Sequence, residues 1–308
     1  MSKGAQPLIT IYTCVYNMAD KINRAIDSVK AQSYKNIEHL IIDDGSTDGL
    51  KPIIEDYIKS VDYEVVYIFK ENGGKHTAEN VAFMKSRGDY LVQLDADDEL
   101  LPEALSCFMQ IWDNIKTRAD YNNFWCVSCG VRSQFSNQLF GDPFPENIND
   151  LDESGRKRTL SQIQGEKCGC MRRDIICSYR FPEPPYVKFV TESVVWDKVN
   201  SLWKTWYSNE IVRIYHIDEG PSLSKPKKSP QYFANYNWQY RYTKINGKQF
   251  KIRDYIKYAL SYFMSTDEYR TCNRYLDEQM FSIYEKGLVV VLYFPSWLIA
   301  KALLLLND

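Results

Sequence analysis

Apolar residues in the first hundred positions follow two alternating periods. Short β-branched and apolar runs predict strands at residues 8–15, 37–42, 64–69 and 90–94. Between these runs, apolar residues spaced three and four apart predict helices at 19–32, 48–60 and 75–87. Strand and helix alternate strictly, so we predict an α/β fold of Rossmann-like type: a mostly parallel sheet with helices on both faces.

A polar cluster follows each predicted strand. These clusters lie at residues 13–17, 43–49, 72–76 and 95–98. Parallel sheets of this kind bind ligands beyond the carboxyl ends of their strands. We therefore expect the four clusters to meet at one edge of the sheet and to form a binding site there.

The sequence Asp95-Ala96-Asp97-Asp98 carries the strongest chemical signal. Carboxylates this close repel one another unless a cation or protonation relieves them. A hard divalent cation, Mn²⁺ or Mg²⁺, held by one or two carboxylates and by diphosphate oxygens fits this pattern. The alternative is that Asp97 or Asp98 caps a helix starting near residues 101–103. The run 43–49 is likewise open to interpretation as a turn followed by a helix cap.

Taken together, four motifs resemble glycosyltransferase family 2, which has the A-type nucleotide-diphospho-sugar transferase fold. They are Val15-Tyr16-Asn17, the run 43–49, Asn72-Gly73-Gly74-Lys75 with Ala78 and Asn80, and the run 94–98. The resemblance spans residues 7–110. It implies that Asp44 contacts the nucleotide base, that Asp95 lies near the ribose, that Asp97 binds the metal and that Lys75 lies near the diphosphate. We expect the nucleotide sugar to be bound by Thr13, Tyr16, Asn17, Asp44, Asn72, Gly74, Lys75, His76, Asp95 and Ala96.

The same resemblance implies a carboxylate base that removes the proton from the acceptor hydroxyl in an inverting displacement. Glu192 is the best match, with the aromatic Trp196 four positions later, although Thr191 stands where the family usually has a first acid. Asp197 is the reserve candidate and lies on a different helical face. The alternative for Glu192 is a carboxylate that stabilises a helix start.

The chain contains three histidines, and each suggests a different role. His39 lies inside a predicted strand, which indicates a structural role. His76 follows the predicted diphosphate loop, where we expect a donor contact. His216 follows an apolar run, and some A-type transferases complete the metal shell with a late histidine; a hydrogen-bonded packing role is the alternative.

Composition narrows the class of protein. The chain has 308 residues, is 44% hydrophobic and 25% charged, and carries a net charge of −2. These values are typical of globular proteins and argue against a generic nucleic-acid binder. Eight cysteines form no regular framework and no secretory signal opens the chain, so we predict free thiols and a cytoplasmic location. Zinc binding by Cys126 and Cys129 is a weak alternative.

The C-terminal third differs in character from the rest. Residues 225–258 contain nine Lys or Arg and one acid, with aromatics interleaved, and the stretch 287–300 carries no charge. This pattern predicts peripheral attachment of residues 225–306 to an anionic membrane face, because Pro295 and Lys301 make a poor spanning helix. A buried terminal helix or a dimer contact is the alternative. Membrane attachment would suit a lipid-linked glycan acceptor at the cytosolic leaflet.

We therefore predict three regions: a nucleotide-sugar half at 1–110, an acceptor half at 111–220, and a helical extension at 221–308, with a long loop at 140–158. The predicted function is inverting, metal-assisted transfer of a sugar, by default from a UDP-sugar, to a glycan or lipid-linked glycan. A nucleotidyltransferase would carry a Gly-rich basic loop after the first strand, which residues 16–20 lack. A non-catalytic binding module would not need Asp97 or a base.

Overall fold

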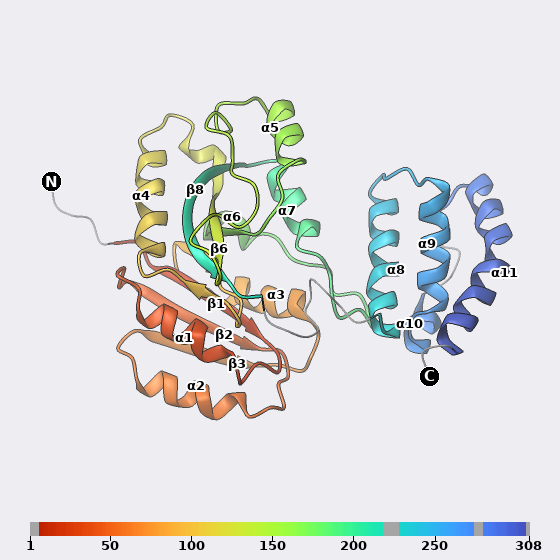
Figure 1. Cartoon of the computed structure of the whole chain (residues 1–308), viewed down its shortest axis with the longest axis horizontal. Helices are drawn as coiled ribbons and strands as arrows, with labels where there is room; N and C mark the ends of the chain where they lie inside the picture. Colours follow the sequence, from red (N-terminus) through yellow and green to blue (C-terminus); the bar gives the residue numbers. More distant parts are fainter. Residues whose placement is uncertain (1–5, 218–227, 274–279, 306–308) are drawn as a thin grey trace. The chain divides into compact units, whose positions relative to one another are not determined.

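The computed structural model describes residues 6–217, 228–273 and 280–305, which form two compact units (Figure 1). Unit 1 comprises Met1–Phe181 and Ser193–Asp218, and unit 2 comprises Pro182–Glu192 and Glu219–Asp308. The boundary predicted at 220/221 falls outside the described residues. The second unit also takes in residues 182–192, which the linear division of the sequence did not anticipate.

The first half of unit 1 contains all seven predicted elements. They are β1 (Ile9–Val15), α1 (Ile22–Lys30), β2 (Ile37–Asp43), α2 (Leu50–Lys59), β3 (Glu64–Phe69), α3 (Lys75–Lys85) and β4 (Tyr90–Gln93). The helices are up to five residues shorter than predicted, because polar residues at their ends belong to the connecting loops. All four strands pair in parallel, in the order β3-β2-β1-β4.

The second half of unit 1 extends the same sheet with a mixture of directions. Within the described residues, the sheet has eight strands in the order β3-β2-β1-β4-β7-β6-β8-β5. The added strands are β5 (Glu99–Leu100), β6 (Phe124–Ser133), β7 (Lys167–Arg172) and β8 (Lys204–Tyr215). β7 is antiparallel to both β4 and β6, and β5 is antiparallel to β8. The parallel prediction therefore holds for the pairings among β1, β2, β3 and β4, whereas the strands that follow them, from β5 onward, pair in mixed directions.

Helices cover both faces of the sheet, as predicted. Ile9 and Ile11 of β1 lie in the core that contains α1 and α4 (Ala104–Lys116). The ring of Tyr12, the residue that follows Ile11, meets Phe83 of α3 edge-on at 5.9 Å between centroids. Since neighbouring residues of a strand point to opposite faces, α3 packs on the face opposite α1 and α4. On the α4 face, Trp112 is fully buried.

Short helical segments complete unit 1. They are a 3₁₀ turn (Tyr121–Asn123), α5 (Glu153–Leu160), α6 (Arg173–Ile176) and α7 (Ser193–Asn200). The prediction of an uninterrupted loop at 140–158 was wrong at its end. Asp152 caps α5 by accepting a hydrogen bond from the backbone N–H of Gly155 at 2.7 Å. No residue of α5 is buried, so the helix has no apolar stripe that the sequence pattern would reveal.

Unit 2 consists of helices. Its elements are α8 (Pro230–Ile245), α9 (Ile252–Phe263), α10 (Asp267–Cys272) and α11 (Ile283–Leu305). Aromatic side chains dominate its core, which contains Tyr240, Tyr255, Tyr258, Met280, Phe281 and Val289. Segment 182–192 is tied to α8: the Lys188 N–H donates to Asn235 at 2.9 Å, and Gln231 donates to the Tyr186 carbonyl at 2.9 Å. Among the helices of the described residues, none is both long and apolar enough to cross a bilayer.

Candidate active site

The loops after β1 and β2 meet at the carboxyl edge of the parallel strands, as the sequence predicted. The Asn17 backbone N–H donates to Ser46 Oγ at 2.9 Å, and Asn17 Oδ1 accepts from the Thr47 N–H at 2.8 Å. Asn17 takes a positive φ of 49°, which asparagine tolerates better than most residues. The Ala19 N–H donates to Asp48 at 2.7 Å. These bonds fix the two loops to one another, and Tyr16 beside them is 49% exposed.

Asp44 organises the loop that follows β3. Its carboxylate accepts hydrogen bonds from Lys70 Nζ at 2.6 Å and from the backbone N–H groups of Gly73 and Gly74 at 2.9 and 2.7 Å. The Asn72 side-chain amide donates to the Asp44 carbonyl at 3.0 Å. Asp44 is 3% exposed, and its carboxylate holds the loop at the start of α3. Contact of Asp44 with a nucleotide base stays a prediction.

Gly45 lets this loop approach β2 closely. Its φ is +86°, and a Cβ at this position would lie 2.8 Å from the backbone nitrogen of Asn72. Both the left-handed backbone and the lack of space require glycine here. The chain turns within residues 43–49, as one interpretation of the sequence held, but the helix cap that this interpretation included is not made by a side chain, because the residue at the N-cap of α2 is Gly49. The turn brings two predicted donor-binding loops together.

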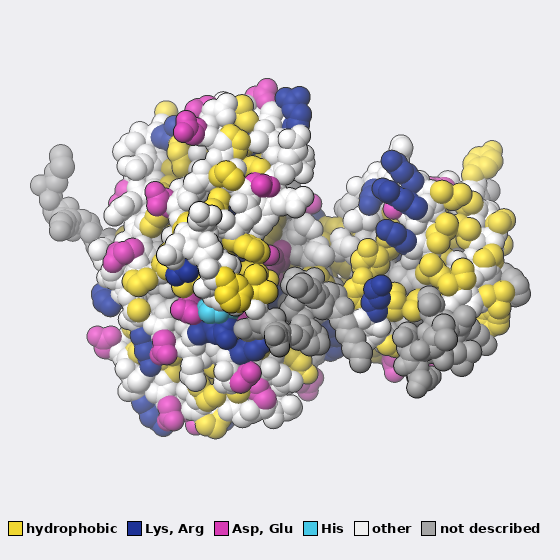
Figure 2. Space-filling model, in the orientation of Figure 1, with side chains coloured by type: hydrophobic (Ala, Val, Ile, Leu, Met, Phe, Trp, Pro, Cys, Tyr) yellow, Lys and Arg dark blue, Asp and Glu magenta, His cyan; other side chains and the backbone are white. Residues whose placement is uncertain are grey.

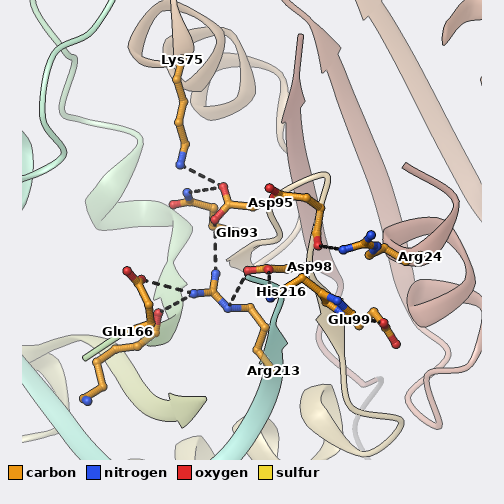
Figure 3. Close-up of polar contacts among 11 residues, drawn as sticks. Arg24, Lys75, Gln93, Asp95, Asp98, Glu99, Glu166, Arg213 and His216 are labelled. Carbon is orange, nitrogen blue, oxygen red and sulfur yellow. Dashed lines mark hydrogen bonds and ion pairs between the residues drawn. The ribbon is translucent and has the colours of Figure 1, made fainter. Parts of the chain in front are cut away.

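Asp95 lies between two cations at the end of β4 (Figure 3). Lys75 Nζ contacts its Oδ1 at 2.9 Å, and Arg213 approaches its Oδ2 at 3.4 Å. Burial disfavours the charged form of Asp95, but Lys75 and Arg213 outweigh that effect and lower its pKa to about 2. Lys75, predicted to lie near a diphosphate, is therefore held over the Asp95 carboxylate.

Asp98 is the most buried carboxylate of this group, with a side chain that is 1% exposed. Burial raises its pKa to about 7; Arg213 opposes that shift, while the negative charges of Asp95 and Asp97 add to it. Arg213 Nε lies 3.4 Å from Asp98 Oδ2, and the His216 N–H donates to Asp98 Oδ1 at 2.9 Å. Burial is thus the main reason that the charged form of Asp98 is disfavoured, and repulsion from Asp95 and Asp97 is secondary.

The residues predicted to hold a metal lie beside this cluster. Asp97 is half-buried, and its backbone carbonyl accepts from Arg24 at 3.0 Å. The His216 imidazole is bonded through Nε2 to Glu99 at 2.6 Å. Within the described residues, no three His, Cys, Asp or Glu side chains are grouped so as to hold a metal ion by themselves. The crowded acids nevertheless fit a dication whose remaining ligands are phosphate oxygens and water.

Thr13 and His76, two other residues predicted to bind the nucleotide-sugar donor, are buried near the same edge of the sheet. Thr13 is fully buried, and its hydroxyl shares a 3.0 Å hydrogen bond with His39 Nε2. His39 Nδ1 in turn shares a 2.9 Å bond with the Tyr57 hydroxyl, so His39 has the structural role that its place in a strand indicated. His76 lies in the first turn of α3 and is 1% exposed. Contact of Thr13 and His76 with the donor stays a prediction.

Glu192, the predicted base, belongs to unit 2, whereas the carboxylate cluster belongs to unit 1. Glu192 is the last residue of the segment that belongs to unit 2, immediately before α7 of unit 1. Trp196, the aromatic residue four positions later, packs in unit 1 against Trp125 and Phe181, with ring centroids 5.6 and 6.0 Å apart. The role of Glu192 as base stays a prediction.

Sequence reasoning missed Arg213, which connects the site to β8. Its guanidinium is 5% exposed and reaches Asp95, Asp98 and, at 3.7 Å, Glu166. The signal was present: Arg213 is a single cation within the apolar run 211–215. A cation inside a buried strand requires acidic partners, and the sequence does not show which acids they are.

A comparison with protein families identifies the family of the chain. The model of the family described as glycosyl transferase family 2 matches residues 10–178, more than half of the chain. The chain belongs to this family. The match includes the four polar clusters at the carboxyl edge and ends before β8, so it does not include Arg213 or His216.

Curated relatives of this glycosyltransferase come from bacteria. Glycosyltransferase GlyA of Streptococcus pneumoniae is 36% identical over 142 residues, which is 46% of this chain but 20% of that protein. The GalNAc(5)-diNAcBac-PP-undecaprenol beta-1,3-glucosyltransferase of Campylobacter jejuni is 24% identical over 263 residues, 83% of this chain and 81% of that enzyme. The chain thus spans a small part of some relatives and most of others.

Solved structures of glycosyltransferases share the fold. Staphylococcus aureus TarS residues 1–349 with UDP-GlcNAc matches with a TM-score of 0.57 at 16% identity, covering 92% of this chain and 79% of that one. The mannosyltransferase PcManGT of Pyrobaculum calidifontis with GDP-Man and Mn²⁺ matches with a TM-score of 0.53 at 15% identity, covering 97% and 84%. This glycosyltransferase therefore has the A-type fold, and at such identities the likeness concerns the fold alone.

Proposed function

We propose that this glycosyltransferase transfers a sugar from a UDP-sugar to a hydroxyl of a glycan by direct displacement, with inversion at the anomeric carbon. The observation that carries the proposal is the carboxylate cluster at the end of β4, where Asp98 is raised to a pKa of about 7 beside Asp95 and Asp97. A partly buried cluster of acids at a sheet edge that already contains Lys75 and Arg213 suits the binding of a cation together with a diphosphate.

The donor is held by the loops at this edge. Lys75 supplies a point charge for the diphosphate, and the loop ordered by Asp44 supplies polar backbone close to it. Asp97 and His216 would hold Mn²⁺ or Mg²⁺, which when bound neutralises charge that develops on the departing nucleoside diphosphate. The structural relatives with UDP-GlcNAc and with GDP-Man and Mn²⁺ support a nucleotide-sugar donor and a metal.

Glu192 is the proposed base. It accepts the proton of the acceptor hydroxyl as that oxygen bonds to the anomeric carbon and the bond to the diphosphate breaks. Direct displacement of this kind inverts the configuration of the sugar. The proposal follows from the family resemblance around residues 190–197 and from the position of Glu192 just before α7.

The proposed acceptor is a lipid-linked glycan at the cytosolic face of a membrane. The Campylobacter relative, whose name specifies an undecaprenol-linked acceptor, matches over most of both chains. Because the match covers 83% of this chain, it reaches beyond the nucleotide-sugar half into the region that would bind an acceptor.

Release of UDP from a panel of UDP-sugars with Mn²⁺ tests the donor and the metal, even without an acceptor. We expect Asp97→Asn to lower the rate at least about 100-fold, since one metal ligand is lost. Asp113→Asn, an exposed acid on α4, is the matched control and should leave the rate unchanged. Equal rates for Asp97→Asn and the parent chain would refute the metal assignment. Release of pyrophosphate from UTP and a sugar phosphate would instead indicate a nucleotidyltransferase.

The base and the stereochemistry need an acceptor. With a competent glycan acceptor, NMR of the product should show the anomeric configuration opposite to that of the donor. Glu192→Gln should lower transfer by at least about 100-fold while the KM for the donor changes little, because proton removal and donor binding are separate. Retention of configuration, or full activity of Glu192→Gln, would contradict the proposed mechanism.

A further inference from the structure

Within the described residues of unit 2, helix α11 has apolar side chains on two sides, and one of these sides is buried in the unit. Its inner side contributes Val289, Ser296 and Ala300, which are 0%, 3% and 2% exposed. A helix at the surface of a globular unit ordinarily has one apolar stripe and one polar face. The apolar residues on the other side of α11 therefore have no partner among the described residues of unit 2.

The outer α11 face consists of Tyr284, Val290, Val291, Leu298 and Ile299. Tyr284, Val291 and Leu298 recur at seven-residue spacing, which is two helical turns, and are 91%, 72% and 47% exposed. Val290 beside them is 57% exposed. Two charged residues lie near the start of the helix. Glu285 is engaged by an ion pair with Lys244 and a hydrogen bond from the Tyr255 hydroxyl, and Lys286 is half-buried. The exposed side chains of the outer α11 face thus form an apolar strip along the helix.

A basic rim lies on α9, the helix that packs against α11, and on the turn before α9. Lys248, Lys251, Arg253 and Lys257 are exposed, and so are the apolar Ile252 and Ile256 of α9, at 63% and 37%. Between residues 228 and 263 the one acid, Asp254, is buried and accepts the Lys251 N–H at 2.9 Å. Every exposed charge on this stretch is therefore positive. In Figure 2, hydrophobic side chains gather over α9 and α11, with Lys and Arg side chains beside them.

We propose that the outer α11 face and the basic rim dock onto the surface of an anionic lipid bilayer. The apolar side chains would enter the boundary between headgroups and acyl chains, while the basic rim would lie against the lipid phosphates. A single exposed tyrosine at the start of the strip suits that boundary, because its ring is apolar and its hydroxyl is wet. The finding that no described helix crosses a bilayer leaves docking in the plane as the mode that fits this face.

The charge pattern favours a bilayer over a second copy of this chain. A two-fold dimer through the same face would bring two basic rims toward one another, and like charges at a partly desolvated interface oppose association. An anionic bilayer meets the same rim with opposite charge. Among the described residues of unit 2 the exposed acids are Glu183, in the segment 182–192, and Asp267 and Glu268 on α10, beyond the end of α9 that is remote from Lys251 and Arg253.

Flotation of the full chain with vesicles tests the proposal. We expect the chain to float with vesicles of phosphatidylcholine mixed with phosphatidylglycerol, to float poorly with phosphatidylcholine alone, and to be released by high salt. Val291→Glu combined with Leu298→Glu should weaken partition at least about ten-fold, since two apolar side chains no longer enter the boundary. Leu202→Glu, which changes a 74% exposed leucine of unit 1, is the matched control and should float normally.

A second pair of changes separates the contribution of the basic rim from that of the outer α11 face. Lys251→Glu combined with Lys257→Glu should abolish the preference for anionic vesicles, with at least roughly five-fold weaker partition for each residue changed. Circular dichroism shows whether each variant is folded, and hydrogen exchange of the parent chain should show protection of α11 when anionic vesicles are added. That second measurement needs no variant.

Three results would overturn the proposal: no flotation with anionic vesicles, flotation that the α11 changes leave intact, or vesicle addition that leaves exchange of α11 unaltered. A dimer in solution that Val291→Glu and Leu298→Glu dissociate, without vesicle binding, would identify the face as an interface between copies. The assay contains no donor or acceptor. Its outcome is therefore independent of whether the proposed sugar transfer is correct.

Discussion

Acidification is expected to destabilise unit 1 through His39, the buried histidine of β2. His39 is fully buried, and its two ring nitrogens are bonded to the hydroxyls of Thr13 and Tyr57. Burial disfavours the charged imidazolium and lowers the pKa of His39 from 6.5 to about 3. In the unfolded chain the ring titrates at its ordinary value, so it gains a proton on unfolding at any pH between these two values.

The sign and size of the effect follow from this difference. A depressed folded-state pKa gives stability that is present above pH 6.5 and is lost as the pH falls toward 3. At pH 5 the loss that His39 contributes is about 2 kcal/mol, from 1.5 pKa units at 1.36 kcal/mol each. The loss at pH 7.5 is close to zero, because both states are then neutral.

Urea unfolding of the parent chain and of His39→Gln between pH 7.5 and pH 5 measures this contribution. Glutamine offers a donor and an acceptor but does not titrate, so every other titrating group cancels in the difference between the two chains. The stability advantage of the parent chain should shrink by about 2 kcal/mol over this range. A difference independent of pH, or an NMR spectrum showing a protonated His39 ring at pH 5 in the folded chain, would refute the reasoning.

Three further predictions concern the site. Arg213→Met should lower the free energy of unfolding by about 3–5 kcal/mol, because Asp95 and Asp98 lose a buried counterion. Urea unfolding measures this free energy, and a decrease of less than about 1 kcal/mol would contradict the account. Gly45→Ala should lower the free energy of unfolding by more than about 1 kcal/mol and raise the KM for the donor, because the added Cβ would collide with Asn72. An unchanged free energy of unfolding and an unchanged KM would argue against the close approach of the two loops. Chelation should abolish UDP release and added Mn²⁺ should restore it, so activity that survives EDTA would exclude the proposed cation role.

The sequence predicts the parallel half of the sheet because its inner strands are buried on both faces and are rich in apolar residues. β2 is buried at all seven positions and is apolar at Ile37 and at residues 40–42. The helices between the strands keep a clear apolar face, such as Ile22, Ala25, Ile26 and Val29 on α1. Because each parallel strand is followed by a short loop at the same edge, the meeting of residues 13–17 with 43–49 could be predicted as well.

The second half could not be predicted in this way, because its contacts join distant residues. β7 enters between β4 and β6, and the resulting neighbours leave no local pattern. Arg213 reaches Asp95 across 118 positions of sequence. The internal engagement of Asp44 was missed for a similar reason, since its backbone partners Gly73 and Gly74 lie about thirty residues away and carry no side chain that would signal a bond.

The chain leaves unit 1 after Phe181 and re-enters it at Ser193, and the excursion is hydrogen-bonded to α8. Cutting the polypeptide near residue 217 would therefore keep every strand of the sheet but strip segment 182–192 of its bonds to Gln231 and Asn235. Glu192 sits at the end of that segment, so loss of activity in such a shortened enzyme would not by itself implicate a membrane or an acceptor. Point changes on α11 leave the hydrogen bonds of segment 182–192 to α8 in place. They therefore separate a loss of membrane or acceptor binding from a loss of the bonds that hold this segment.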